Sequence, residues 1–218
     1  MGDHLDFGMP LDEAMQTQRA IRRLKPDPVS GELISKLIEA ATKAPSGGDR
    51  QPWAFVVIRD PATRQKIGEW YLDAWNQTYG AAPREAIERL PANQIRVLRS
   101  AEHLARHLAE APVLILACVR VAAPPGSAPG VATASHYGSI FPAVQNLLLA
   151  ARGLGLGATL TTLHRLHEQD VKDLLGIPAN VEAVALIPVG HPIGRYGPTK
   201  RRPVEDVVNY DRWGSSKA

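Results

Sequence analysis

The sequence predicts an α+β protein in which helices cover both faces of a small buried sheet, with an extended arm at the end. Short apolar, β-branched runs of strand length alternate with longer stretches of helical periodicity. The chain from residue 191 onwards is rich in Gly, Pro and Arg. With 218 residues and 44% hydrophobic content, one core suffices. We therefore expect a single domain over residues 1–190 and an arm over residues 191–218.

The first predicted elements surround a turn of small residues. Residues 11–24 favour a helix, which KPDPVS ends because a residue before proline avoids the helical region. Ser30 is the expected N-cap of a second helix, whose apolar residues recur at helical spacing. The run AFVVI at residues 54–58 predicts a strand buried on both faces. The stretch APSGGDRQPW connects that helix to this strand.

The rest of the chain continues the alternation. Helices are predicted at residues 60–80, 91–111, 139–155 and 168–176. Strands are predicted at residues 112–121, near 158–162, and at 182–190. The segment APPGSAPG, residues 123–130, reads as a surface loop. The helix at 139–155 is apolar but too short to span a membrane, so we expect it in the core.

Composition excludes several classes of protein. The 25 basic and 22 acidic residues give a net charge of +3, which is too small to indicate nucleic-acid binding, and the basic clusters lack interleaved aromatic residues. A single cysteine, Cys118, excludes a disulfide framework and is expected to be buried. The N-terminus has no leader pattern and no run is long enough to cross a membrane. We expect a cytoplasmic protein without membrane or nucleic-acid partners.

Two basic clusters lie near the two ends of the chain. The first comprises Arg19, Arg22, Arg23 and Lys25, and the second comprises Lys200, Arg201 and Arg202. Each cluster alone is typical of a solvated face. Both flank apolar elements, so they could also converge on one anion, for which arginine is well suited. Spacing alone leaves the two interpretations open.

Three other patterns indicate structure more than chemistry. RGLGLGA at residues 152–158 follows a helix and leads into a strand, which is the reverse of a dinucleotide-binding loop, so it predicts a helix end and turn. His103 and His107 have a chelating spacing but no third ligand, so no metal site is expected. An aromatic group on one helix indicates core packing or the roof of a flat ligand; it comprises Trp70, Tyr71, Trp75 and Tyr79.

Four segments together resemble the FMN-dependent nitroreductase family. They are QRAIRRLKPDPV, APSGGDRQPWAFVVI, FPAVQNLLLAARGLGLGATLTT and LIPVGHPIGRYGPTKRRPVEDVV, in the family's order along nearly the whole chain. The resemblance implies a three-layer α–β–α sandwich with a small mixed sheet. It also implies a homodimer that exchanges its C-terminal arms, with FMN at the interface and each site drawing on both chains.

Matching positions imply which residues contact FMN. Gln18-Arg19-Ala20 stands where the family often has Arg-Arg-Ser, and the tail positions are chosen because residues two apart in an extended segment face the same side, which leaves the role of Arg201 open. The implied cofactor-binding residues are Gln18, Arg19, Ala20, Pro45, Ser46, Gly47, Asp49, Leu160, Thr161, Thr162, Leu163, Lys200 and Arg202.

The implied chemistry rests on the cofactor. Small residues at 45–48 allow a close approach to the isoalloxazine edge, and Asp49 occupies the family's usual Asn position. The backbone at residues 160–163 is expected to meet N5, so no side chain need act as acid or base. NAD(P)H supplies hydride, and a nitroaromatic, quinone or similar small electron acceptor receives it.

Two alternatives stay open at this point. The first is a specialised FMN enzyme of the same fold, either a reductive dehalogenase or a flavin-fragmenting enzyme. The second is a non-catalytic protein that binds flavin or deazaflavin. Retention of FMN without NAD(P)H oxidation distinguishes the second from the oxidoreductase.

Overall fold

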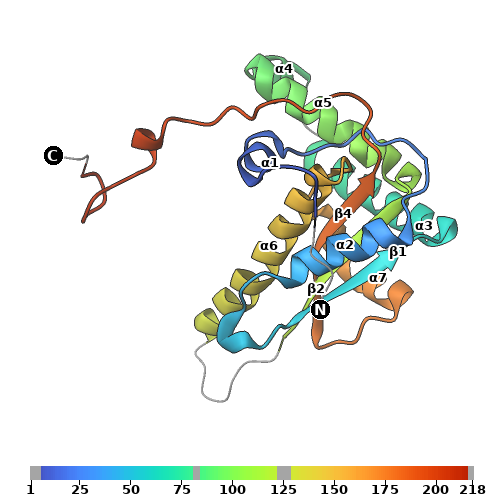
Figure 1. The fold of residues 1–218 in the computed structure, drawn as a ribbon. Coiled ribbons are helices and arrows are strands. Elements are labelled where there is room, and N and C mark those ends of the chain that lie inside the picture. Colours follow the sequence, from blue (N-terminus) through green and yellow to red (C-terminus); the bar gives the residue numbers. More distant parts are fainter. Residues whose placement is uncertain (1–5, 81–83, 122–128, 216–218) are drawn as a thin grey trace.

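A four-stranded sheet forms the middle of three layers in the computed structural model, which describes residues 6–80, 84–121 and 129–215 (Figure 1). The strand order is β1-β2-β4-β3. The strands are β1 (Trp53–Ile58), β2 (Val113–Arg120), β3 (Gly157–Ala158) and β4 (Val181–Gly190). The strand expected near residues 158–162 is therefore shorter than predicted, and it continues only as an isolated bridge between Thr161 and Leu186.

All three strand pairings in the described parts of the chain are antiparallel, in place of the mixed sheet that we expected. Ile58 at the end of β1 lies opposite Leu114 near the start of β2. The helices between these strands therefore leave and return at the same end of the sheet, which forces the antiparallel arrangement.

Burial differs sharply between the central and edge strands. Seven consecutive residues of β2 are buried, and its alternate side chains face two separate apolar clusters on the two sides of the sheet. Strand β1 was predicted to be buried on both faces, and this was wrong: it is an edge strand whose Val57 is 37% exposed. A short apolar run does not reveal whether a neighbouring strand or helix covers it.

Helices α2 (Gly31–Thr42) and α6 (Pro129–Gly153) pack against each other on one face of the sheet. Ser30 caps α2 as predicted, since its hydroxyl accepts a hydrogen bond from the Leu33 N–H at 3.2 Å. Helix α6 begins ten residues before the predicted start at 139. The expected loop at 123–130 thus includes the first residues of α6, and its residues 123–128 lie outside the described parts.

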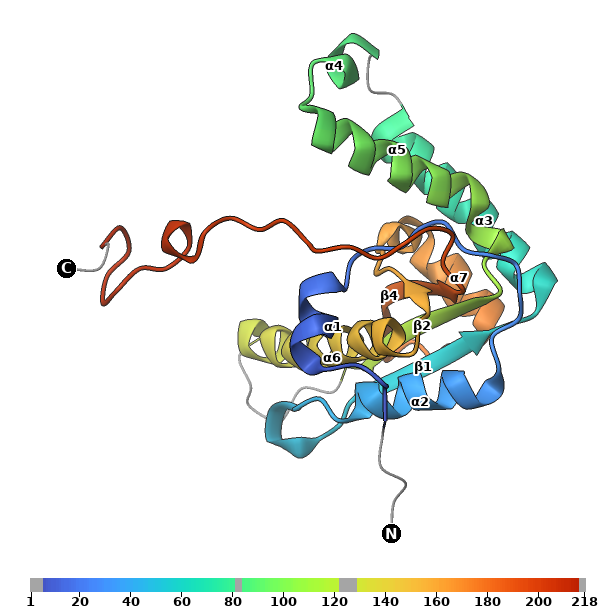
Figure 2. The same ribbon diagram turned by 45° about the horizontal axis from the view of Figure 1, so that its top comes forward.

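The opposite face carries the helices between β1 and β2 and those between β3 and β4. These comprise α3 (Pro61–Trp75), η2 (Asn76–Gly80), α4 (Arg84–Glu88), α5 (Ala92–His107), η3 (Leu108–Glu110), η4 (Leu163–His167) and α7 (Glu168–Leu175). The predicted helices at 60–80, 91–111 and 168–176 are confirmed, whereas α4 was not predicted. Figure 2 shows that α4 and the adjoining end of α5 project from the body.

The two ends of the chain lie along the body before the C-terminal segment leaves it. Helix α1 (Leu11–Thr17) stops seven residues before the predicted end at 24. The Ile21 N–H donates to the Ala158 carbonyl at 3.0 Å, and Leu24 bridges Pro192, so tertiary hydrogen bonds hold this stretch extended. The tail after β4 is extended as expected and includes η5 (Val204–Asp206); its last part runs away from the body (Figures 1 and 2).

Candidate cofactor and substrate site

Backbone hydrogen bonds bring the two basic clusters together. The Ile193 N–H donates to the Arg23 carbonyl at 2.9 Å, and the Lys25 N–H donates to the His191 carbonyl at 2.8 Å. Further along the tail, the Thr199 N–H donates to the Gln16 carbonyl at 2.9 Å. The segments of residues 16–25 and 191–199 therefore run side by side, although nearly the whole chain separates them in sequence.

The tail has a further anchor on α6. The Tyr196 hydroxyl donates to the Leu156 carbonyl, and its ring packs on the Arg152 guanidinium at 4.2 Å. Burial raises the pKa of Tyr196 to about 12, so the hydroxyl keeps its proton at physiological pH. This anchor holds the tail just before its basic cluster begins.

A basic hollow of about 730 Å³ lies where these two segments meet α5. It is lined by Arg19, Ala20, Arg22, Asn93, Arg96, Val97, Ser100, Pro198, Thr199, Lys200 and Arg201. Five of these side chains are cationic and none is acidic. Within the parts of the chain that the structure describes, none of the five forms an ion pair. Arg19 and Arg22 of the first basic cluster thus share one cavity with Lys200 and Arg201 of the second, and convergence of the clusters on one anion stays a prediction.

An apolar pocket of about 540 Å³ adjoins the basic hollow, with which it shares Arg22, Asn93 and Val97. Its wall consists of residues 160–163, the inner faces of α3 and α5, and the residues just before α5. Three members of the aromatic group line it, namely Tyr71, Trp75 and Tyr79. The fourth, Trp70, instead stacks on His167 at 6.3 Å between ring centres. A flat ligand thus has an aromatic wall on one side.

Arg22 stands at the junction of the two cavities. It is half-buried, and burial lowers the pKa of its guanidinium while the nearby Tyr71 hydroxyl opposes that shift. Tyr71 itself is buried, and its hydroxyl lies 2.6 Å from the Thr161 hydroxyl. Burial raises the pKa of Tyr71, although the hydrogen bond to Thr161 partly offsets this. The junction therefore combines a poorly solvated cation with a neutral pair of hydroxyls.

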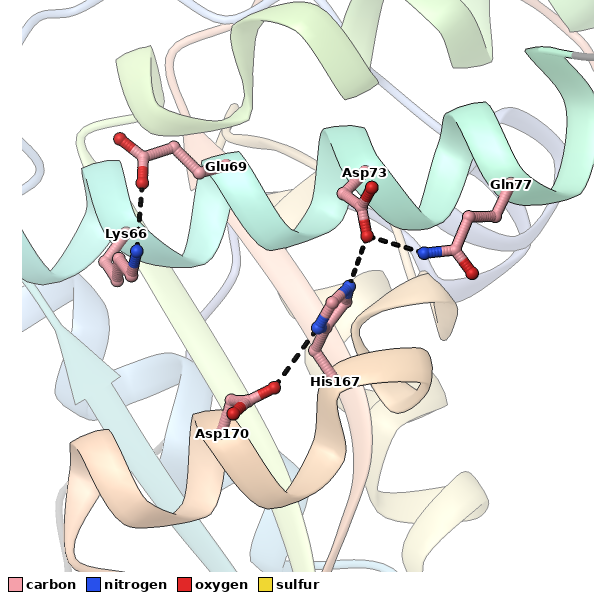
Figure 3. Close-up of polar contacts among 6 residues, drawn as sticks. All are labelled: Lys66, Glu69, Asp73, Gln77, His167 and Asp170. Carbon is pink, nitrogen blue, oxygen red and sulfur yellow. Dashed lines mark hydrogen bonds and ion pairs between the residues drawn. The ribbon is translucent and has the colours of Figure 1, made fainter.

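The wall at residues 160–163 is rigidly supported. The Thr161 N–H and carbonyl both bond to Leu186 of β4 at 2.9 Å. Just beyond this wall, His167 contacts Asp73 on α3 through Nε2 at 2.7 Å and Asp170 on α7 through Nδ1 at 3.2 Å. Figure 3 shows this bridge, in which Gln77 also donates to Asp73. The bridge ties α3, and hence the aromatic wall, to the segment that faces it.

The turn at residues 45–51 is strained and lies elsewhere. Gly48, Asp49 and Gln51 all have positive φ values, at 60°, 52° and 48°. The Ser46 hydroxyl accepts from the Gln51 N–H at 3.0 Å, and the Gly47 N–H donates to the Ser139 hydroxyl at 3.2 Å. Backbone strain at two non-glycine residues persists only where the surroundings enforce it, and such strain clusters at functional sites.

The structure brings some of the implied cofactor residues together and separates others. Arg19, Ala20 and Lys200 line the hollow, and residues 160–163 line the adjoining pocket. The turn residues Pro45, Ser46, Gly47 and Asp49 line neither cavity. Their turn packs beside α6 through η1 (Gly47–Asp49), and the segment lies at the other end of the ribbon from α4 and α5 in Figure 1. Gln18 and Arg202 line neither cavity either, whereas Arg201 does.

Sequence reasoning missed the contribution of α5. Asn93, Arg96, Val97 and Ser100 all line the hollow, and their spacing of three, four and seven residues places them on one helix face. The signal was present in the sequence as a polar stripe, but it resembles any solvated helix face. Only the position of α5 beside the two chain ends distinguishes it.

The remaining patterns are structural. Helix α6 ends at Gly153, and Gly155 just beyond it has a φ of 72°, as the helix-end interpretation of RGLGLGA predicts. His103 and His107 stack at 4.3 Å, and the described residues contain no group of three potential metal ligands. Cys118 is buried, which raises the pKa of its thiol to about 11. None of the helices in the described part of the chain has the length and apolarity that crossing a bilayer requires.

Known proteins share this architecture. A family model described as the nitroreductase family matches residues 15–191. The chain is 32% identical over 201 residues to NADH dehydrogenase of Thermus thermophilus, which covers 88% of this chain and 91% of that protein. It is 32% identical over 183 residues to iodotyrosine deiodinase 1 of Rattus norvegicus, or 83% of this chain and 61% of that protein. A crystal structure of oxidized iodotyrosine deiodinase bound to FMN and 3-iodo-L-tyrosine superimposes with a TM-score of 0.73 at 24% identity, covering 94% of this chain and 100% of that one.

Proposed function

The chain belongs to the nitroreductase family of flavoprotein oxidoreductases, and we propose that it transfers hydride from NAD(P)H through bound FMN to electrophilic acceptors in a ping-pong cycle. Nitroaromatics and quinones are the acceptor classes that we propose. The observation that carries this proposal is the pair of adjoining cavities, one cationic and one apolar with an aromatic wall. FMN has the same two parts, a phosphate and a flat ring.

The residues present fit FMN. Arg19 and Lys200 come from the two paired chain ends, and both lack a carboxylate partner among the described residues, so they are available to a phosphate. The ring would lie against residues 160–163 in the neighbouring pocket. Because the Thr161 N–H is already donated to Leu186, the backbone of Thr162 and Leu163 is the candidate donor to ring atom N5.

The protein's contribution is to position, polarise and shield. Bound FMN supplies the two-electron chemistry that none of these side chains can perform. Arg22, half-buried beside the ring pocket, stabilises negative charge that develops there, and it does so more strongly than it would in water. The Tyr71 and Thr161 hydroxyls hold the pocket floor in place, and the aromatic wall excludes water. No side chain is assigned as acid or base.

We further propose that the active unit is a homodimer. The turn at residues 45–51 packs beside α6, whereas α5 lines the basic hollow and lies at the other end of the ribbon in Figure 1, so we infer that the turn approaches a ring in a second copy. The C-terminal arm agrees with this arrangement: beyond the basic cluster, Val204, Val207 and Trp213 are exposed, at 72%, 55% and 95%. Exchange of the arms would bury these apolar side chains.

A specialised FMN enzyme is the second candidate, favoured by the similarity to iodotyrosine deiodinase 1. In that case the residues of α5 that line the apolar pocket, with Leu90 just before this helix, would hold one specific halogenated substrate. A broad oxidoreductase needs no such contacts. The two functions differ in whether simple quinones reoxidise the reduced protein quickly.

An anaerobic titration of the purified protein tests the proposal. We expect a bound flavin to bleach stoichiometrically with NADH or NADPH and to recolour when a nitroaromatic or a quinone is added. Bleaching by dithionite alone, with no reaction to either nicotinamide, would favour the specialised enzyme or a non-catalytic flavin-binding protein. Failure to bind supplied FMN would overturn the assignment of the site.

A further inference from the structure

The basic hollow carries more positive charge than one cofactor phosphate requires. Five cations line it with no acidic residue, and none of them has a carboxylate partner in the described parts of the chain. A phosphate monoester carries about two negative charges at neutral pH. A cluster of unneutralised cations repels itself, and this cost is recovered only when anions bind. About three positive charges therefore remain after FMN is accounted for.

The surplus has a defined place on α5. Arg96 lies on the hollow with Asn93 one turn before it and Ser100 one turn after it. These three side chains offer a guanidinium, an amide and a hydroxyl on one helix face, all of which can donate hydrogen bonds to phosphate oxygens. Arg201 from the tail lines the same cavity and adds a second guanidinium. The family resemblance implied no role for any residue of α5.

The shape of the site limits what this second anion can be. The hollow adjoins the apolar pocket, because Arg22, Asn93 and Val97 line both cavities. A nicotinamide that reacts in the apolar pocket must leave the rest of its dinucleotide along an adjoining opening. The hollow has a volume of about 730 Å³, which is larger than one phosphate group needs and is in the range of small-molecule binding sites.

We propose that the α5 face of the basic hollow, with Arg96 at its centre, binds the 2′-phosphate of NADPH and makes NADPH the preferred donor. This inference rests on the proposed function, because it names the donor of that same site. Arg96 provides the bidentate contact, and Ser100 and Arg201 complete the phosphate site. NADH lacks this phosphate and leaves these cations without a partner.

The test compares Arg96→Gln with Arg99→Gln. Both residues are exposed arginines on α5, but Arg99 lines neither cavity, so it controls for loss of positive charge in general. Flavin reduction is followed by stopped-flow with NADPH and with NADH. We expect the unaltered protein to favour NADPH, and Arg96→Gln to lower kcat/KM for NADPH roughly ten- to a hundredfold while kcat/KM for NADH changes less than about twofold. Arg99→Gln should change neither.

A binding measurement separates this inference from the proposed function. Calorimetry with adenosine 2′,5′-bisphosphate, and with adenosine 5′-phosphate as its counterpart, needs no catalysis. Binding of the first that depends on Arg96 would support the site even if the protein proved unable to oxidise either nicotinamide. Equal use of NADH and NADPH with no selective binding would overturn the inference and leave the oxidoreductase standing. Loss of FMN from Arg96→Gln, or an equal loss of NADPH activity in Arg99→Gln, would overturn it as well.

Discussion

Two regions of this molecule differ in whether their cationic side chains have carboxylate partners. Arg165 lies 2.6 Å from Glu182 and 3.4 Å from Glu168, and the Tyr137 hydroxyl donates to Glu182 at 2.6 Å. Burial opposes ionisation of Glu182, but the hydrogen bonds from Tyr137 and Arg165 outweigh it and hold the pKa of this carboxyl below its usual value. The basic hollow has five cations and no acidic residue in its lining.

This difference separates charges that hold the fold together from charges that await a ligand. A side chain whose partner belongs to the same chain contributes to the free energy of unfolding. One whose partner is absent contributes to binding and adds repulsion to the empty protein. Substitutions in the two regions should therefore affect different measurements, and four predictions test this separation, from the largest expected effect to the smallest.

The double substitution Arg19→Ala and Lys200→Ala should remove FMN binding without unfolding the protein. Each charge-assisted hydrogen bond to the phosphate is worth roughly 1.5–3 kcal/mol, so we expect Kd for FMN to rise by more than about a hundredfold. Fluorescence quenching measures it. Riboflavin is the control, because it lacks the phosphate and its affinity should hardly change. An equal loss for both flavins would show that the two residues support the ring or the fold.

His164 lines neither cavity, so it should affect the fold and not a ligand. Its contribution to the free energy of unfolding should depend on pH. It is fully buried, its Nε2 contacts the Ala183 carbonyl at 3.1 Å, and burial lowers its pKa to about 4. The unfolded chain, with a His pKa near 6.5, binds the proton more readily. The contribution of His164 to the free energy of unfolding is thus fully present above about pH 6.5. It decreases as the pH drops towards 4, by up to roughly 3 kcal/mol.

Urea unfolding of the protein and of His164→Phe over this pH range measures the effect. The variant has no imidazole to protonate at this position. The free energy of unfolding of the unaltered protein should therefore fall relative to that of the variant as the pH drops. Carboxylates titrate in the same range but do so in both proteins and cancel. A difference that stays constant with pH would contradict the prediction.

Arg165→Ala should destabilise the protein while leaving FMN bound. It leaves Glu182 and Glu168 without their cation in a partly buried place, and we expect a loss of about 2 kcal/mol in the free energy of unfolding. Arg106→Ala is the control: its partner Glu102 is well exposed, so the loss should be below about 1 kcal/mol. FMN affinity should stay within about twofold for both. A large loss of FMN affinity in Arg165→Ala would contradict the prediction that this region supports the fold and not the cofactor.

Asp49 carries the opposite charge to the five cations of the basic hollow and lies outside that hollow. Its carboxylate accepts a hydrogen bond from the neutral Gln51 amide at 3.1 Å, and among the residues that the structure describes it forms no ion pair. If the turn meets a flavin in a second copy, this charge opposes reduction. Asp49→Asn should then raise the two-electron reduction potential by about 20 mV, the equivalent of about 1 kcal/mol. Potentiometric titration measures it, and an unchanged or lowered potential would count against contact between Asp49 and the ring.

Much of the fold could be predicted because it is encoded locally. The Ser30 cap, the helix at 60–80, the buried strand at 112–121 and the Gly155 turn each depend on residues within a few positions of one another. The predictions that were wrong concern long-range contacts. The helix expected at 11–24 stops at Thr17 because the following residues bond to Ala158 and His191, which no local pattern reveals.

The candidate site likewise combines residues that local sequence motifs indicate with residues that only long-range contacts bring together. Four sequence segments indicated the family, and matching positions within them implied Arg19, Lys200 and residues 160–163. They could not show that Arg19 and Lys200 share one cavity, that α5 adds Arg96 to it, or that the turn at residues 45–51 lies on another side of the chain.

The sequence by itself determined most of the helices and strands, the buried cysteine and the four family segments, because apolar periodicity and turn chemistry act over a few residues. Only the tertiary structure decided which charges are paired. The Thr199 hydroxyl bonds to the Gln16 carbonyl across a separation of 183 residues, and the basic hollow exists only because the chain ends meet in this way. The free energy of a charge depends on what lies within a few ångströms of it, and the order of residues in the chain does not specify that.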